Sequence, residues 1–160
     1  MDSEAVKLLE GMNIKPNLVM MDIEASTDQQ ALDILANRLF EKGIVKKSYI
    51  AAVKAREIEY CTGLQFEEMG IAIPHTDIEH VNQGAIGIGI LKHPVPFCFM
   101  GMPEISVDVE IMFMMAIKEA HTQIEFLQAL MTIFQTRGRL KAIKACKTPE
   151  EVVDTFQSFF

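Results

Sequence analysis

Residues 70 to 75 read GIAIPH. The apolar run at 71–73 is typical of a buried strand. Pro74 should end that strand, because proline lacks a backbone N–H for the ladder and holds the preceding residue extended. His75 is therefore expected just beyond a strand terminus. In open α/β sheets ligands collect outside the carboxyl ends of the strands, so His75 occupies a place where a ligand is expected.

Three further segments have strand patterns. Residues 17–23 (NLVMMDI) and 85–92 (AIGIGILK) are mostly apolar, and Gly87 and Gly89 allow another part of the chain to approach closely. Residues 107–117 alternate between apolar and acidic side chains and then become fully apolar, as in a strand that passes from half-buried to buried. A turn is expected at 93–96 (HPVP) and a loop at 61–70 (CTGLQFEEMG).

Helical patterns separate and follow these strands. One helix is expected after the cap candidates Ser26, Thr27 and Asp28, and a second from about residue 48 to 59. Others are expected from Thr122, over 140–146, and after Thr148 as N-cap. The apolar faces expected for the first three helices comprise Leu32, Leu35, Ala36, Leu39 and Phe40; Ile50, Val53, Ala55 and Ile58; and Ile124, Leu127, Leu130, Met131 and Phe134. Strands alternating with helices predict an α/β fold, a mixed β-sheet flanked by helices on both faces, in a single domain over 1–160.

Composition excludes several classes of protein. The net charge of −7 would repel a phosphate backbone, so nucleic acid is not an expected partner and a basic protein is a better match. Three cysteines without a close pair suit a reducing compartment, and the acidic N-terminal stretch does not resemble a secretory signal. No apolar run approaches the roughly 20 residues that span a bilayer. We therefore expect a cytoplasmic protein with no direct membrane insertion.

Two histidines precede similar sequences, HTDIE at 75–79 and HTQIE at 121–125. Each contains the S/T-x-x-E pattern of a capping box, which predicts a helix start beside both imidazoles. Unpaired N–H groups at such a start favour an anion. Neutral imidazole is a competent nucleophile near neutral pH, and Arg56 is the best candidate cation, because its planar fork can hold two phosphate oxygens.

Other readings of these residues stay open. His75 could be a solvated loop residue without function, since histidines are often partly buried. A metal site from His75, His80 and His121 lacks the spacing of known motifs, and the GIG at 87–89 lacks the rest of a dinucleotide fingerprint. No metal or cofactor is therefore expected.

The segment Arg56-Glu57, Thr62-Gly63-Leu64 and the GIAIPH motif resembles the active-site region of the fructose/mannitol class of enzyme IIA in the bacterial sugar phosphotransferase system (PTS). The resemblance extends over roughly residues 17–158 and implies the fold of that class. It also implies that His75 accepts phosphate from the phosphocarrier protein HPr and passes it to a cysteine of enzyme IIB, which works with a membrane IIC component.

The resemblance also implies roles for individual residues. His121 matches an auxiliary histidine of the family and Arg56 its phosphate-stabilising arginine, while Thr62, Thr76 and Glu57 are the further expected binding residues. The continuation PHTD and the segment REIEYCTGL look most like galactitol-specific enzyme IIA proteins. The alternative is a regulatory module similar to the nitrogen-related enzyme IIA proteins, whose phosphorylation state controls a protein target.

Overall fold

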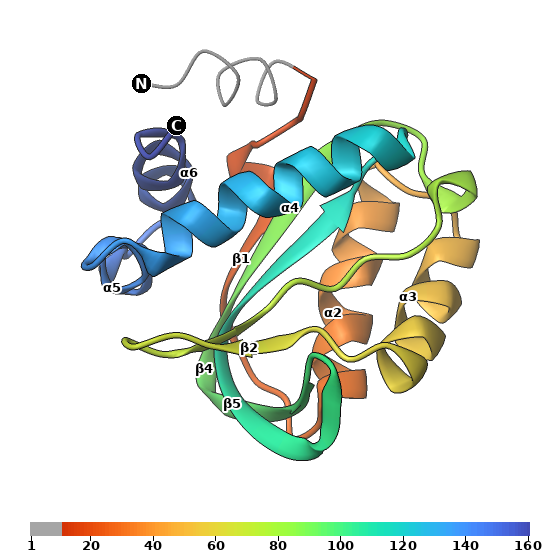
Figure 1. Cartoon of the computed structure of the whole chain (residues 1–160). Coiled ribbons are helices and arrows are strands. Elements are labelled where there is room, and N and C mark those ends of the chain that lie inside the picture. The colour runs from red at the N-terminus through yellow and green to blue at the C-terminus, as the bar shows by residue number, and fades with distance from the viewer. Residues whose placement is uncertain (1–10) are drawn as a thin grey trace.

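A long antiparallel hairpin forms the centre of the sheet in the computed structural model, which describes residues 11–160 (Figure 1). Its strands are β4 (Ala85–Phe99) and β5 (Met102–Ala116), joined at Gly101, whose φ of +82° suits glycine. β1 (Val19–Ile23) pairs parallel to β4, and β3 (Gly70–Ala72) pairs parallel to β5. β2 (Gly63–Gln65) pairs antiparallel to β3 and touches the far end of β4 through one bridge. The sheet is therefore mixed, as predicted.

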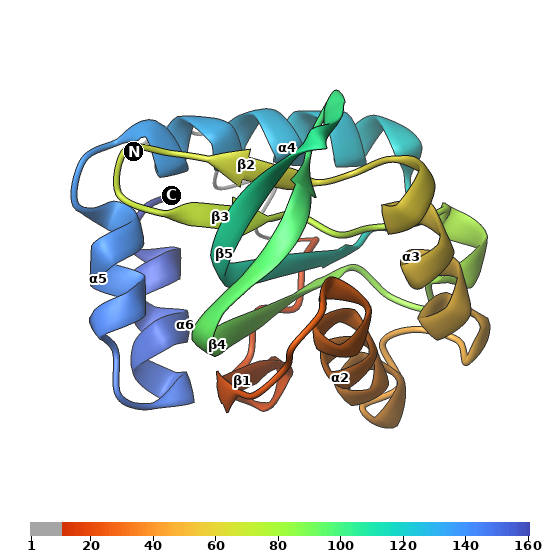
Figure 2. The ribbon, with the colours of Figure 1, turned by 90° about the horizontal axis from the view of Figure 1, so that it is seen from below.

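Helices cover both faces of this sheet (Figures 1 and 2). One face carries α2 (Asp28–Glu41) and α3 (Ser48–Glu59). The other carries α4 (Ala120–Gln135), α5 (Arg139–Ala145) and α6 (Pro149–Gln157). Two short 3₁₀ turns, η1 (Pro16–Leu18) and η2 (Ile78–His80), complete the elements. The predicted α/β class with helices on both faces is confirmed.

The central strands are buried on both sides because their side chains alternate between two apolar clusters. Ile88, Ile111 and Phe113 face the cluster under α4, α5 and α6, whereas Met112 and Met114 face α2 and α3. This alternation explains why β4 and the second half of β5 read as continuous apolar runs.

Gly87 and Gly89 let α2 pack close to β4. A Cβ atom at Gly87 would lie 2.9 Å from Leu39 Cδ2, and one at Gly89 would lie 3.2 Å from Leu35 Cδ2. The close approach expected from these glycines is confirmed, and a side chain at either position would force neighbouring leucine side chains of α2 to shift.

Two predicted connections are instead strands. The HPVP segment is part of β4, whose pairing with β5 is irregular between Ile90 and Val95 and then resumes. β1 follows β4 only as far as Leu91, so the prolines lie at a free sheet edge, where the missing N–H is tolerated. The predicted loop at 61–70 contains the β2–β3 hairpin, whose turn is closed by a hydrogen bond from Phe66 N to Met69 O.

Two of the expected N-caps are formed, whereas two of the expected helix faces are only partly correct. Thr27 Oγ1 accepts from Gln30 N and Thr148 Oγ1 from Glu151 N, as N-caps do. On α3, however, the buried side chains are Tyr49, Val53 and Glu57, while the predicted core residue Ile58 is 70% exposed. On α4 the predicted core residue Ile124 is 61% exposed. Phe126 and Ile133 are buried in that helix together with the expected Leu130 and Phe134.

Over residues 11–160, no helix combines the length and apolar character that crossing a bilayer requires. The acidic stretch for which no secretory signal was expected lies mostly in residues 1–10, outside the described part of the chain.

Candidate functional site around His75

His75 is the third residue after strand β3 and is held by backbone hydrogen bonds on both sides. Pro74 O accepts a hydrogen bond of 2.9 Å from Met115 N of β5, which ties this turn to the centre of the sheet. The His75 ring nitrogen Nδ1 lies 2.9 Å from Ile73 O. A carbonyl oxygen can only accept, so Nδ1 carries the proton and Nε2 keeps its lone pair. The backbone thus selects the tautomer in which Nε2 is free to act as a nucleophile.

The surroundings of His75 favour its neutral form. Burial lowers the pKa of the half-buried imidazole below its usual 6.5, and the charge of Arg56 acts in the same direction. The bond to Ile73 O and the carboxylate of Asp77 partly oppose this shift in pKa. His75 is therefore uncharged and nucleophilic at neutral pH.

Arg56 is placed beside His75 by the last turn of α3. Its guanidinium stacks on the Tyr60 ring, with 5.0 Å from Cζ to the ring centroid, and Nη1 lies 3.7 Å from Asp77 Oδ1. The Nε–H group is buried and has no hydrogen-bond partner. A buried donor without an acceptor is costly, so this arginine has a binding position left for an anion.

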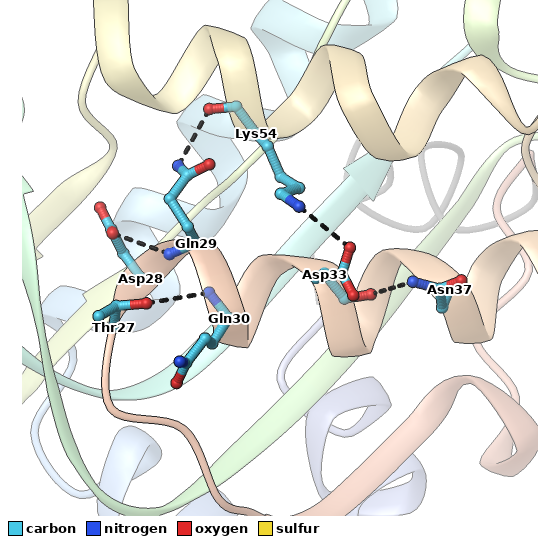
Figure 3. A network of polar contacts seen from close by, with 7 residues as sticks. All are labelled: Thr27, Asp28, Gln29, Gln30, Asp33, Asn37 and Lys54. Carbon is cyan, nitrogen blue, oxygen red and sulfur yellow. Dashed lines mark hydrogen bonds and ion pairs between the residues drawn. The ribbon is translucent and has the colours of Figure 1, made fainter.

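Polar contacts between α2 and α3 fix the turn that carries Arg56 (Figure 3). Gln29 Nε2 donates to Lys54 O at 3.1 Å, and Lys54 Nζ pairs with Asp33 Oδ1 at 3.1 Å. The turn of α3 just before Arg56 is therefore anchored to its neighbouring helix.

Glu57 does not face the phosphate site as expected. The side chain is 2% exposed, and its two carboxylate oxygens accept from the backbone N–H and the hydroxyl of Thr62, each at 2.6 Å. Burial raises the pKa of Glu57 to about 7, against the opposing effect of both Thr62 hydrogen bonds. Glu57 and Thr62, both expected to contact ligand, bind each other instead.

The predicted capping box after His75 is not formed. Thr76 is buried, and η2 begins after Asp77, with no side-chain hydrogen bond at its cap. A 3₁₀ turn of three residues replaces the predicted helix start. The prediction that the free N–H groups of a helix terminus lie beside His75 is therefore wrong. The positive charge beside His75 comes from Arg56 rather than from a helix terminus.

His121 lies in the first turn of α4, which begins at Ala120. The side chain is 84% exposed, and Nε2 lies 2.6 Å from Glu125 Oε1. The second predicted capping box is also absent, because Thr122 Oγ1 donates to Glu119 Oε2 instead. In Figures 1 and 2 the N-terminal end of α4 lies at the same end of the molecule as η2. No hydrogen bond within residues 11–160 joins His121 to His75 or Arg56.

Sequence reasoning missed two neighbours of Arg56. Tyr60 follows it by four residues, the spacing at which side chains meet on a helix face, so this contact had a readable signal. Asp77 had none, because its approach depends on the turn after Pro74. The third histidine of the considered metal site, His80, contacts Ser48 Oγ at 2.8 Å through Nδ1, and no cluster of three potential metal ligands occurs over residues 11–160.

Several known proteins are similar in sequence to the chain. It is 36% identical over 106 residues to the transcriptional regulator ManR of Bacillus subtilis, a match covering 66% of this chain and 15% of ManR. It is 37% identical over 57 residues to the galactitol-specific PTS EIIA component of Escherichia coli K12, covering 36% of this chain and 38% of that protein. An ascorbate-specific PTS EIIA component from Salmonella choleraesuis is 26% identical over 140 residues, covering 86% and 88%.

Solved structures share the fold. The Escherichia coli mannitol enzyme IIA, determined in complex with phosphorylated mannitol enzyme IIB, superposes with a TM-score of 0.72 at 17% identity, covering 92% of this chain and 99% of that one. The nitrogen regulatory protein IIA-Ntr of Neisseria meningitidis superposes with a TM-score of 0.64 at 18% identity, covering 91% and 96%. Residues 12–159 match the sequence family described as "Phosphoenolpyruvate-dependent sugar phosphotransferase system, EIIA 2". The chain belongs to this EIIA family of the sugar phosphotransferase system.

Proposed function

We propose that the chain is a phosphohistidine carrier that accepts a phosphoryl group from HPr on Nε2 of His75 and passes it to a cysteine of enzyme IIB. The observation that carries this proposal is the unpartnered, buried Nε–H of Arg56 beside an imidazole whose tautomer is fixed. A phosphoryl group on Nε2 would bring the oxygens that this donor lacks. Family membership supports the same chemistry.

The transfer balances without a cofactor. The Nε2 lone pair attacks the phosphorus of phospho-HPr, the bond from phosphorus to the donor nitrogen breaks, and the donor keeps that electron pair. The phosphorylated ring of His75 keeps its Nδ1 proton and gains a positive charge, which the Ile73 carbonyl stabilises. A IIB thiolate then attacks phosphorus, and the electron pair of the P–N bond returns to Nε2.

Exposed apolar side chains support a docking face around this site. Ile58 lies in the last turn of α3 and Tyr60 is its C-cap residue. Ile78 lies on η2 next to Asp77, and Ile124 lies one turn from the start of α4. Apolar groups near a reactive histidine suit short-lived contact with protein partners, and the net charge of −7 would speed encounter with a basic one. The proposal places the protein in the cytoplasm with HPr.

The finer proposal is that the carrier serves a galactitol-type IIB. It rests on the 37% identity to the galactitol component over 57 residues, beside the longer but weaker likeness to the ascorbate component. Incubation with enzyme I, HPr and phosphoenolpyruvate, followed by galactitol, ascorbate and mannitol IIB proteins in parallel, tests both levels. We expect labelled phosphate on the chain and fastest transfer to galactitol IIB. No label would refute the carrier function, and faster transfer to another IIB would refute only the sugar class.

A regulatory role is the second candidate, because the chain is 36% identical over 106 residues to a transcriptional regulator. In that case the chain would still be phosphorylated on His75 but would discharge to none of the IIB proteins. Its gene neighbourhood would then lack IIB and IIC genes.

A further inference from the structure

Glu57 is a buried acid that the phosphoryl-transfer chemistry does not use. Both of its oxygens are committed to Thr62, with N–H and hydroxyl donors each at 2.6 Å. The pair therefore bridges the last turn of α3 and the residue that precedes β2. Short charge-assisted bonds of this kind are among the stronger hydrogen bonds in proteins.

Thr62 in turn contacts the strand that leads to His75. Thr62 O accepts from Ile73 N at 3.3 Å, and Ile73 O accepts from Nδ1 of the His75 ring at 2.9 Å. Three hydrogen-bonded steps thus connect Glu57 to the imidazole. Glu57 follows Arg56 directly in the last turn of α3. These hydrogen bonds therefore connect the helical turn that carries Arg56 to the ring of His75.

The step between Thr62 and Ile73 lies beyond the regular ladder. β2 begins at Gly63 and β3 ends at Ala72, and Pro74 has no N–H with which to continue the pairing. Gly63 is packed tightly against β4, because a Cβ atom at this position would lie only 2.5 Å from Cys98 O. The position of Thr62 is therefore set by β2 on one side and by the Glu57 carboxylate on the other.

We infer that Glu57 is a positioning residue, which holds Thr62 so that the Ile73 carbonyl fixes the His75 tautomer and its distance from Arg56. This inference rests on the proposed carrier function for its kinetic consequence but not for its structural one. Misplacement by about 1 Å at a reacting group can cost about 100-fold in rate. The groups facing Glu57 are Thr62, Cys61 and, from the start of α2, Asp28.

A set of conservative variants separates positioning from packing. Glu57→Ala removes both bonds, whereas Glu57→Gln can keep them, since its carbonyl accepts from the Thr62 N–H and its amide donates to the hydroxyl. Thr62→Val removes only the hydroxyl bond, and Thr62→Ser restores it. Glu59→Ala is the matched control, because it removes an exposed carboxylate two residues further along α3.

The decisive readout is the His75 ring tautomer, measured by ¹⁵N NMR on the full chain without phosphate. We expect one Nδ1–H tautomer in wild type, Glu57→Gln, Thr62→Ser and Glu59→Ala, and a mixture of tautomers in Glu57→Ala. Phosphoryl transfer from phospho-HPr should slow about 10- to 100-fold in Glu57→Ala, with Thr62→Val between it and wild type.

A folded Glu57→Ala with a single tautomer and wild-type transfer would overturn the inference. If Glu57→Ala does not fold, Thr62→Val decides, and a wild-type tautomer and rate in that variant would overturn it as well. If wild type accepts no phosphate, the carrier proposal fails, whereas the tautomer comparison still decides the role of Glu57.

Discussion

His75 and His121 begin almost the same pentapeptide but lie in different environments. His75 is half-buried, its Nδ1 is bound to Ile73 O, and Arg56 lies beside it. His121 is 84% exposed and pairs with Glu125 one helical turn away. The difference comes from what precedes each histidine. Pro74 ends a buried strand, whereas Glu119 opens a surface helix. A histidine motif therefore gains its chemistry from the element before it.

The sharpest test of this comparison is loss of the acceptor. His75→Gln should fold, because its amide N–H can replace the Nδ1 donor to Ile73 O, yet it should take up no phosphate from phospho-HPr. His121→Gln is the matched control and should be labelled. Acid-labile, base-stable phosphate on the His75→Gln variant would contradict the assignment.

Removing Arg56 is expected to have the next largest effect. Arg56→Ala should slow transfer about 100-fold, because it deletes the cation and the free Nε–H beside the phosphoryl oxygens. Rapid-quench kinetics with HPr and with IIB measure both steps. Arg56→Lys should recover only part of the rate, since an ammonium group cannot make a forked contact. Unchanged rates in Arg56→Ala would place this residue outside the site.

Protonation should stop phosphoryl acceptance by His75 only below the usual imidazole pKa of 6.5. Because burial lowers the pKa of His75 below 6.5, phosphoryl acceptance should persist through pH 6.5 and then fall about tenfold for each pH unit below the folded pKa. The unfolded chain binds more protons between the folded pKa and 6.5, so His75 also lowers stability as pH falls through that window. A rate profile measured in the His121→Gln background isolates His75, and an inflection above pH 6.5 would contradict the burial argument.

His121 should matter least of the three residues. To assist transfer it must leave Glu125 and reach a phosphoryl oxygen, a single hydrogen bond worth about 1 kcal/mol net. We therefore expect His121→Ala to slow transfer about fivefold. Glu125→Gln, which frees the ring, should be neutral or slightly faster. Slowing of 100-fold or more in a folded His121→Ala would mean that the two histidines act together, against the contrast drawn between them.

Much of the fold could be predicted from sequence because its signals are local. Thr27 and Thr148 are N-caps, and Pro74 ends a strand, each through chemistry confined to a few residues. The alternation at 107–113 predicted the buried positions of β5 but not their faces, because Val107 and Val109 pack on the side of α2 and α3 whereas Ile111 and Phe113 pack on the other side.

The features that could not be predicted from the sequence depend on contacts with residues in other elements. Tyr49 and Glu57 lie outside the apolar face expected for α3 but are buried, because Met115 O accepts from the Tyr49 hydroxyl and Thr62 donates to Glu57. Neither partner is visible from the helix itself. Ile58 and Ile124 are exposed because the buried faces of α3 and α4 differ from the faces that apolar periodicity predicts.

The two residues proposed for the chemistry could be chosen from the sequence motif, but the residues around them could not be placed. Arg56 lies near enough to His75 to affect its pKa, whereas Thr76 makes no cap and Glu57 is buried against Thr62. The two capping boxes failed because a 3₁₀ turn follows His75 and because α4 begins one residue before His121.

The most direct test of the central claim is ¹⁵N and ³¹P NMR of the chain phosphorylated by enzyme I, HPr and phosphoenolpyruvate. The structure predicts one phosphohistidine, with phosphorus bonded to Nε2 of His75 and a proton retained on Nδ1. Phosphorus on Nδ1 of His75, or on His121, would contradict the account.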